Sequence, residues 1–200
     1  MASETARAAL NKVVGALNSI GAPFALIGGL ALAVWSYPRA TRDVDVLIGV
    51  DELQVQSIID EMVKIGCRPK HTPAINFVGQ HSFLHLLYTP PGEFYDVQFD
   101  LLLATTPLEK TALERSVIRD VPGVSRPIYV LNCDDLILFK LLSGRLIDLA
   151  DAAMLLRENR DSIDLEYTGS AIERLDLVAA FSSTWREAFP GEPIPAELAG

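Results

Sequence analysis

The sequence is poor in the residues from which small proteins build disulfide frameworks and metal clusters. In 200 residues it holds two cysteines, Cys67 and Cys133, without CxxC spacing, and three histidines, His71, His81 and His85. The histidines do not have the spacing of metal ligands on a helix and lie beside none of the motifs below, so we expect packing roles for them. These absences exclude a zinc or dithiol motif and predict two inactive thiols in a reducing compartment.

Long apolar runs and clusters of basic residues are also missing. The apolar stretch 24–35 is far shorter than the roughly 20 residues that a membrane span requires, and no basic leader precedes it. We therefore expect no membrane segment and a cytoplasmic protein. The formal net charge is −9 and the basic residues are scattered, which argues against non-specific electrostatic binding of nucleic acid.

Three widespread ligand-binding fingerprints are absent as well. The chain has no G-K-[ST] and no G-x-G-x-x-G segment, so P-loop and Rossmann nucleotide sites lack their sequence basis. A calcium loop starting at Asp43 would put apolar Leu47 and uncharged Gln54 where oxygen ligands belong. Any phosphate chemistry must therefore use another arrangement.

What the chain does have is enough apolar material for a core, since half of its residues are hydrophobic. Hydrophobic periodicity and turn residues predict alternating helices and strands up to about residue 131 and only helices after 134. The expected helices cover 4–20, 30–35, 51–65 and 107–118, and the expected strands cover 24–27, 43–48, 82–88, 94–103 and 128–131. The strands 82–88 and 94–103 are expected to pair as antiparallel neighbours across the turn at residues 90–92. An α/β core over 1–131 followed by a helical region over 132–200 is the expected organisation.

Two carboxylates, Asp43 and Asp45, begin the strand expected at 43–48. Residues two apart in a strand face the same side at about 6.6 Å, so both side chains can reach a pair of metal sites about 4 Å apart. Magnesium prefers oxygen ligands together with substrate phosphates, so it would arrive with a triphosphate. The alternative is a strand end whose acidic residues are merely solvated.

Gly28 and Gly29 lie where an apolar strand runs into a helix. Such a junction offers backbone N–H groups to a phosphate, and the missing side chain lets the phosphate approach. A tight turn with close packing is the alternative explanation.

Taken together, Gly28-Gly29 and the segment Arg39-Ala40-Thr41-Arg42-Asp43-Val44-Asp45 resemble the nucleotidyltransferase superfamily that includes DNA polymerase β. They look most like its AbiEii-type toxins and small antibiotic nucleotidyltransferases, in which a Gly-Gly or Gly-Ser turn precedes an R-x-T-x-D-h-D strand (h, apolar). The resemblance implies an α/β (α+β) fold, a mixed β-sheet nucleotidyltransferase core backed by helices with a C-terminal helical appendage.

The resemblance also implies a third carboxylate on a neighbouring strand. Asp96 and Asp100 lie on one face of the strand expected at 94–103, and the apolar run after Asp100 favours it, with Asp96 as the alternative. Its role would be to bind a second metal ion and help deprotonate the acceptor hydroxyl. A polar-faced edge strand would account for the same residues without a site.

A second resemblance lies in the helical region. Lys140, Arg145, Asp148 and Asp151 match the K-x4-R-x-K-D-x-x-D signature of AbiEii-like proteins, although Ile147 stands where that signature has lysine. Lys140 would neutralise triphosphate charge or be structural, and Arg145 would do the same or pair with an aspartate of its own helix.

The function implied by these resemblances is transfer of a nucleoside monophosphate from a nucleoside triphosphate (NTP) to an acceptor hydroxyl, with release of pyrophosphate. Mg²⁺ or Mn²⁺ would be held by Asp43, Asp45 and Asp100. The nucleotide-binding residues implied are Gly28, Gly29, Arg39, Arg42, Lys140 and Arg145. Arg39 and Arg42 could equally just balance the charge of Asp43.

The acidic balance favours a small molecule or a protein over tRNA as the acceptor. A cognate antitoxin is a further expected partner, because the resemblance includes toxins of toxin–antitoxin pairs. The alternative function is a catalytically silent member of the fold that binds a partner or a nucleotide.

Overall fold

The computed structural model describes residues 4–50 and 53–198. These residues form two compact units. The first comprises 4–34, 38–50 and 53–131, and the second comprises 35–37 and 132–198, so residues 35–37 group with the C-terminal helices.

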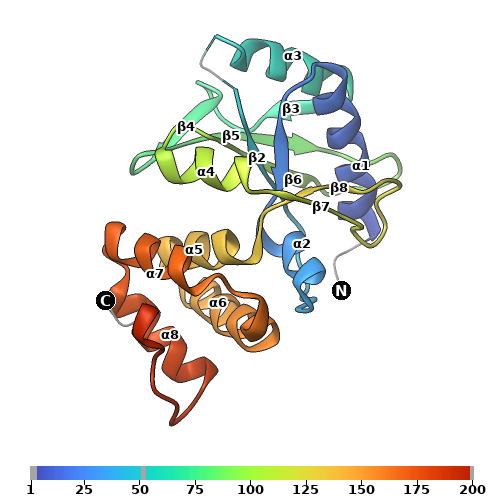
Figure 1. The fold of residues 1–200 in the computed structure, drawn as a ribbon. Helices are drawn as coiled ribbons and strands as arrows, with labels where there is room; N and C mark the ends of the chain where they lie inside the picture. The colour runs from blue at the N-terminus through green and yellow to red at the C-terminus, as the bar shows by residue number, and fades with distance from the viewer. Residues whose placement is uncertain (1–3, 51–52, 199–200) are drawn as a thin grey trace. The chain divides into compact units, whose positions relative to one another are not determined.

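The first unit is built on a mixed sheet whose strands run in the order β3-β5-β6-β2-β1-β8-β7, with β4 paired to β5 (Figure 1). The strands are β1 Phe24–Leu26, β2 Val44–Ile48, β3 Cys67–Pro69, β4 Ile75–Val78, β5 His81–Tyr88, β6 Val97–Leu103, β7 Val117–Arg119 and β8 Ile128–Val130. The pairs β2·β6 and β1·β8 are parallel and the other pairs are antiparallel. The expected mixed sheet and the antiparallel pairing of β5 with β6 are therefore confirmed.

The helices of the first unit are α1 Glu4–Ser19, α2 Gly28–Leu32, α3 Val55–Lys64 and α4 Pro107–Glu114. The 3₁₀ turn η1 Ala33–Trp35 follows α2. The apolar residues of α1 recur at three- and four-residue steps, and this buried face packs against α3, β2 and β6. Helix α4 begins with a capping box between Thr106 and Glu109. The helix expected from residue 51 is described only from Val55, and residues 51 and 52 lie outside the described part of the chain.

One predicted helix is wrong at its C-terminal end. We expected helix over 107–118, but α4 ends at Glu114 and Val117–Arg119 forms strand β7. The Ser116 hydroxyl donates to the Leu113 carbonyl at 2.6 Å, and the β-branched residues that follow pair with β8. Short helix and strand segments of this kind are decided by their partners, here β8, more than by their own periodicity.

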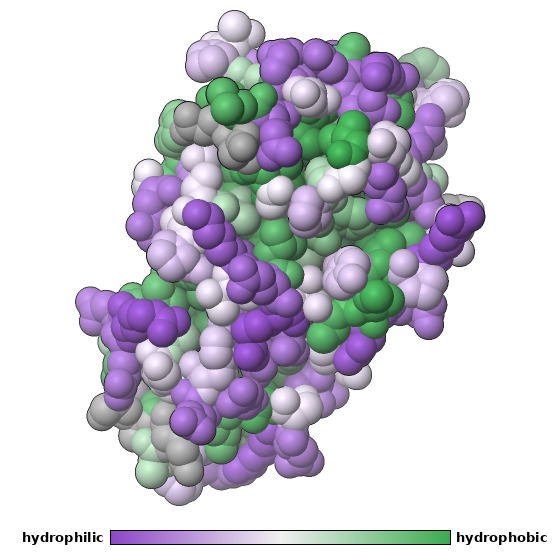
Figure 2. All heavy atoms as spheres, turned by 45° about the horizontal axis from the view of Figure 1, so that its top comes forward, coloured by the Kyte–Doolittle hydropathy of each residue, from purple (hydrophilic) through white to green (hydrophobic). Residues whose placement is uncertain are grey.

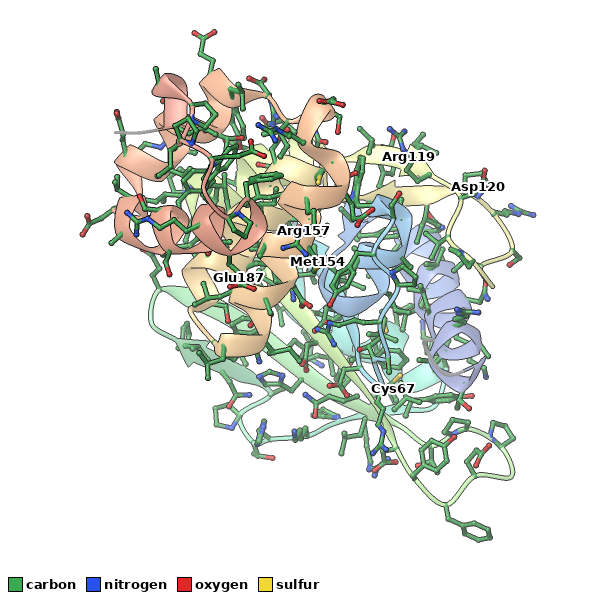
Figure 3. The ribbon with its side chains drawn as sticks, turned by 90° about the horizontal axis from the view of Figure 1, so that it is seen from below. Cys67, Arg119, Asp120, Met154, Arg157 and Glu187 are labelled. Atoms are coloured by element: carbon green, nitrogen blue, oxygen red, sulfur yellow. The ribbon has the colours of Figure 1, made fainter. Side chains whose placement is uncertain are left out.

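The second unit is helical, as expected. Its helices are α5 Cys133–Ser143, α6 Leu146–Asn159, α7 Leu165–Arg174 and α8 Val178–Ala188, with the 3₁₀ turns η2 Arg160–Ser162 and η3 Ala196–Leu198. Helix α5 starts at the side-chain cap of Asn132 and ends at Gly144, whose φ of 64° suits a helix C-terminus. Arg157 of α6 donates to the carbonyls of Glu187 and Ala188 at 2.8 and 3.1 Å, which ties α6 to α8 (Figure 3).

Both cysteines are buried. Burial raises the pKa of the Cys67 thiol (Figure 3) to about 11. Burial, and then the neighbouring Asp134 charge, raises the pKa of the Cys133 thiol to about 12. Both thiols are therefore protonated at neutral pH and are poor nucleophiles.

Exposed apolar side chains occur in both units. On the face drawn in Figure 2, hydrophilic residues dominate and hydrophobic residues gather in small groups between them. Phe77 and Phe94 of the first unit and Leu146 of the second are among the exposed large apolar residues. Scattered residues of this kind are ordinary for a folded protein.

A buried ionic network joins α5 to α6. The Lys140 ammonium donates to Asp148 Oδ1 at 2.6 Å and to Asp151 Oδ2 at 2.8 Å, and all three side chains are buried. Asp148 also accepts hydrogen bonds from Ser143 and Arg145. Burial by itself would raise the pKa of Asp148, but the hydrogen bonds from Lys140, Ser143 and Arg145 outweigh it and the pKa is lowered.

Replacing Lys140 with Met should destabilise the protein by about 3–5 kcal/mol, because it removes the buried cation that Asp148 and Asp151 share. Urea unfolding monitored by circular dichroism measures this loss. Arg145→Met is the matched control, since the Arg145 side chain is 74% exposed and its removal should cost about 1 kcal/mol or less. Equal stability of Lys140→Met and the unmodified protein would contradict the structural role of the network.

Candidate active site

Three polar side chains stand in one row across the centre of the sheet. Strands β2, β6 and β5 are neighbours, and the register sets Asp45 of β2 beside Asp100 of β6, and Asp100 opposite His85 of β5. Adjacent strands lie about 4.8 Å apart, so side chains in such a row can touch their neighbours. The row brings together residues that are 40 and 55 positions apart in the sequence (45 to 85 and 45 to 100).

The row lies on the half-exposed face of the sheet. Along β5 and β6, buried apolar residues such as Leu84, Leu86 and Phe99 alternate with half-buried residues on the other face. Asp45 belongs to that second face, because Val44 and Val46 on either side of it are buried. The period-two pattern of the sequence thus directs the carboxylates away from the core.

Asp43 precedes β2 and interacts electrostatically with Asp100. Partial desolvation raises the pKa of Asp43, and the Asp100 carboxylate raises it further, whereas Lys70 and Arg42 act in the opposite direction. Asp43 and Asp100 are therefore close enough to repel each other, and Arg42 lies near Asp43, as its place in the sequence indicated.

The donor set fits a divalent cation that brings ligands of its own. Asp43, Asp45 and Asp100 offer carboxylate oxygens, and a cation would relieve the repulsion that raises the pKa of Asp43. Within residues 4–50 and 53–198, no three His, Cys, Asp or Glu side chains converge into a ready-made metal cluster.

The Asp45 carboxylate lies very close to Gly28. Its φ is +63°, and a Cβ at this position would lie 2.0 Å from Asp45 Oδ2. The backbone N–H of Ile27, which precedes α2, donates to the Asp45 carbonyl at 3.0 Å. The glycine is thus required both by the backbone conformation and by the approach of Asp45.

Gly29 packs closely against Thr41. A Cβ at this position would lie 2.8 Å from Thr41 Cβ and 2.9 Å from Thr41 Oγ1. Thr41 occupies that space. The two glycines therefore pack against the segment that contains Thr41 and Asp45.

Gly28→Ala should destabilise the protein by more than the roughly 1–2 kcal/mol of a left-handed alanine, because the new methyl group must also displace Asp45. Gly79→Ala is the matched control. Gly79 has φ +60°, but no atom lies within 4 Å of the position that its methyl group would take, so it isolates the backbone cost. Thermal unfolding compares the two variants, and an equal loss in both would contradict the tight contact between Gly28 and Asp45.

Asp96 and Asp100, the two candidates for a third carboxylate, have different surroundings. Asp96 lies just before β6, where it accepts hydrogen bonds from Arg68 at 2.7 Å and Thr89 at 2.6 Å. The hydrogen bond from Arg68, followed by that from Thr89, lowers the pKa of Asp96. Asp96 is thus held by its own exposed partners, whereas Asp100 stands beside Asp45.

Three residues of this face were not singled out by sequence reasoning. His85 Nδ1 lies 2.6 Å from Asp100 Oδ1, and Gln98 Nε2 donates to Asp100 Oδ1 at 2.8 Å and Oδ2 at 3.0 Å. The Lys70 ammonium donates to Gln98 Oε1 at 2.5 Å. The β5·β6 register brings His85 to Asp100, and the β3·β5 pairing brings Lys70 to Gln98, so no local pattern could have found these two residues. Gln98 lies two residues before Asp100 on the same face of β6.

The other predicted nucleotide-binding residues have different surroundings. Arg39 is half-buried, and its guanidinium donates to the Ala40 carbonyl at 3.1 Å, whereas Arg42 is exposed beside Asp43. Lys140 and Arg145 belong to the helical unit, where both bind Asp148.

The mixed sheet, the glycine turn packed on an Asp-x-Asp strand and the helices α5–α8 define a nucleotidyltransferase-like fold. The solution structure of the antibiotic-resistance factor ANT(2'')-Ia is similar, with a TM-score of 0.57 and 14% identity over 92% of this chain and 94% of that one. An antigenic nucleotidyltransferase-like protein from Paracoccidioides brasiliensis has a TM-score of 0.53 and 18% identity, over 94% of this chain and 97% of that one. A putative nucleotidyltransferase from Thermotoga maritima has a TM-score of 0.53 and 15% identity, over 79% of this chain and 96% of that one. Identities this low establish the fold alone.

The family is established by the sequence. Residues 15–197 match the family described as "Nucleotidyl transferase AbiEii toxin, Type IV TA system". The chain therefore belongs to the AbiEii nucleotidyltransferase toxin family. No curated protein shows significant similarity to it. In the described part of the chain, every helix is too short or too polar to cross a membrane.

Proposed function

We propose that the protein is a metal-dependent nucleotidyltransferase that moves a nucleoside monophosphate from an NTP to an acceptor hydroxyl. The observation that carries this proposal is the register of β2 and β6, which sets Asp45 beside Asp100, with Asp43 close enough to sense the Asp100 charge. Membership of the AbiEii family supports the same reaction class.

Each of the three carboxylates has a part in this reaction. Asp43 and Asp45 would hold the divalent cation, Mg²⁺ or Mn²⁺, that accompanies the triphosphate, while Asp100 orients the acceptor hydroxyl and receives its proton. The cation would neutralise phosphate charge at the reacting centre. The acceptor oxygen forms its bond to the α-phosphorus as the bond to the β-phosphate oxygen breaks, and pyrophosphate leaves.

The nucleotide contacts we propose are the turn at Gly28 and Gly29 and the neighbouring cations. Arg42 is exposed beside Asp43 and is suited to attract the triphosphate. In the helical unit, the buried ammonium of Lys140 is engaged by two carboxylates, which favours a structural role. The largely exposed Arg145 is the better candidate there for a phosphate contact.

For the acceptor, we favour a small hydroxyl compound or a protein over tRNA. The net charge of −9 disfavours extended phosphate contacts. A structural relative, ANT(2'')-Ia, has been solved in complex with adenylyl-2''-tobramycin, in which a small molecule carries the adenylyl group. The type IV toxin–antitoxin family also suggests a cognate antitoxin as partner.

The experiment that tests this function supplies the protein with Mg²⁺, each of the four NTPs in turn and separate pools of metabolites, RNA and proteins. Mass spectrometry should detect a product heavier by one nucleoside monophosphate, formed only with the cognate NTP. If no pool gains this mass with any NTP while the protein is folded, the catalytic proposal fails.

A further inference from the structure

His85 is fixed directly against the proposed third carboxylate. It is the register partner of Asp100 in the antiparallel pair β5·β6, and its Nδ1 lies 2.6 Å from Asp100 Oδ1. Both side chains are 19% exposed, so the contact is partly shielded from water. A hydrogen bond of this length to a partly buried carboxylate restrains both groups.

The chemistry of the pair assigns the direction of this hydrogen bond. An ionised carboxylate can only accept, so the proton must be on Nδ1 of His85. The imidazole is also held by its neighbours. It stacks on Phe83, with 5.5 Å between the ring centroids and an angle of 5° between the ring planes. It also meets the His71 ring edge-on, with 5.6 Å between the centroids. The ring plane, and with it the direction of the Nδ1–H bond, is therefore set before any substrate binds.

The Asp100 carboxylate is restrained from a second side. Gln98 Nε2 donates to both of its oxygens, and Lys70 fixes Gln98 by donating to its Oε1. An aspartate without such partners rotates broadly about its terminal torsion. With donors on both sides, the carboxylate has one preferred orientation next to Asp45.

We propose that His85 is a positioning residue for nucleotidyl transfer, which orients Asp100 toward the acceptor hydroxyl through the Nδ1–H bond. The inference rests on the proposed function and deepens it. A misplacement of about 1 Å at a reacting group can cost about 100-fold in rate, so loss of one donor to Asp100 is expected to be visible in kcat.

The test compares two substitutions that differ in the hydrogen-bond donor. In His85→Asn the side-chain amide N–H occupies the place of Nδ1–H along the side chain, whereas His85→Leu fills the space without a donor. We expect His85→Leu to lower kcat about 10- to 100-fold with little change in the KM for NTP, and His85→Asn to recover most of that loss. Equal kcat values in the two variants would overturn the proposal.

A second histidine of β5 provides the matched control. His81 Nδ1 lies 2.5 Å from Glu109 Oε1, a histidine–carboxylate pair of similar geometry at the far end of the strand, where Glu109 caps α4. His81→Leu should leave kcat and KM unchanged. A fall in kcat equal to that of His85→Leu would mean that β5 is merely disturbed, which contradicts a specific role for His85.

A readout without turnover separates this inference from the proposed function. The ¹³C resonance of the Asp100 carboxyl group, assigned with the help of Asp100→Asn, should shift in His85→Leu and return toward its original value in His85→Asn. An unshifted resonance in His85→Leu overturns the positioning role whatever the activity is. If the resonances behave as expected but the unmodified protein transfers nothing to any acceptor pool, the proposed function fails, and what stands is that His85 orients the Asp100 carboxylate.

Discussion

Replacing Asp45 with Asn is expected to lower nucleotidyl transfer by at least about 100-fold, equivalent to about 2.7 kcal/mol of transition-state stabilisation. Asp45 stands on the half-exposed face of β2 beside Asp100 and against Gly28. Asparagine keeps the shape of this side chain and removes its charge, so the sheet should remain while the hold on the cation weakens. Asp43→Asn should have an effect of the same order for the same reason.

Steady-state rates of product formation at saturating Mg²⁺–NTP measure this loss. Asp96→Asn is the matched control, because Asp96 is an exposed aspartate held by Arg68 and Thr89 outside the row. The control should keep its activity. Activity close to that of the unmodified protein in either Asp45→Asn or Asp43→Asn would contradict the assignment of these residues to the metal site.

The stability of Asp43→Asn provides an independent check on the charge arrangement. The pKa of Asp43 is raised by desolvation and by Asp100, so the ionised form is disfavoured in the folded protein. This penalty is absent below the unfolded-state pKa and is fully present once the pH exceeds the raised folded-state pKa. Without metal, Asp43→Asn should therefore melt at a higher temperature at neutral pH and show no such gain in acid.

Replacing Asp100 with Asn should separate nucleotide binding from transfer. Asp43 and Asp45 remain to hold the cation that accompanies the triphosphate, so the affinity for Mg²⁺–NTP should change by no more than a fewfold, about 1 kcal/mol or less. Transfer should fall by about 100-fold or more, because the acceptor hydroxyl loses the carboxylate that receives its proton. Calorimetry and product formation, measured on one protein preparation, test both parts.

The same pair of measurements distinguishes an enzyme from a silent binding module. A silent module would show no transfer before substitution, and its affinity for nucleotide or partner would not depend on Asp100. Loss of transfer in Asp96→Asn together with full activity in Asp100→Asn would instead make Asp96 the third carboxylate. Full activity in both variants would remove the third-carboxylate mechanism.

Much of the first unit could be predicted because its signals are local. The alternation around Asp45 and the apolar runs that became β1, β5 and β8 each report a strand directly. The glycine pair and the Asp-x-Asp strand carry their meaning within a few residues of each other. The structure adds the physical link between them, since Gly28 packs on Asp45 and Gly29 on Thr41.

The register between distant strands could not be predicted in the same way. Strand β5 ends at Tyr88 and β6 begins at Val97, so a loop of variable geometry separates them. A shift of one residue would turn His85 to the buried face, and periodicity alone does not fix that shift. His85 was therefore expected to be a packing residue, and nothing in the sequence drew attention to Lys70.

The most direct test of nucleotidyl transfer at this site follows the phosphates of the triphosphate. The protein is incubated with Mg²⁺, an acceptor pool and an NTP labelled with ³²P either at the α- or at the γ-phosphate, and Asp45→Asn is run in parallel. We expect that the α-label enters the acceptor, that the γ-label leaves as pyrophosphate, and that both events are lost in Asp45→Asn. Transfer of the γ-label to the acceptor, or unchanged α-label incorporation in Asp45→Asn, would contradict the proposed reaction.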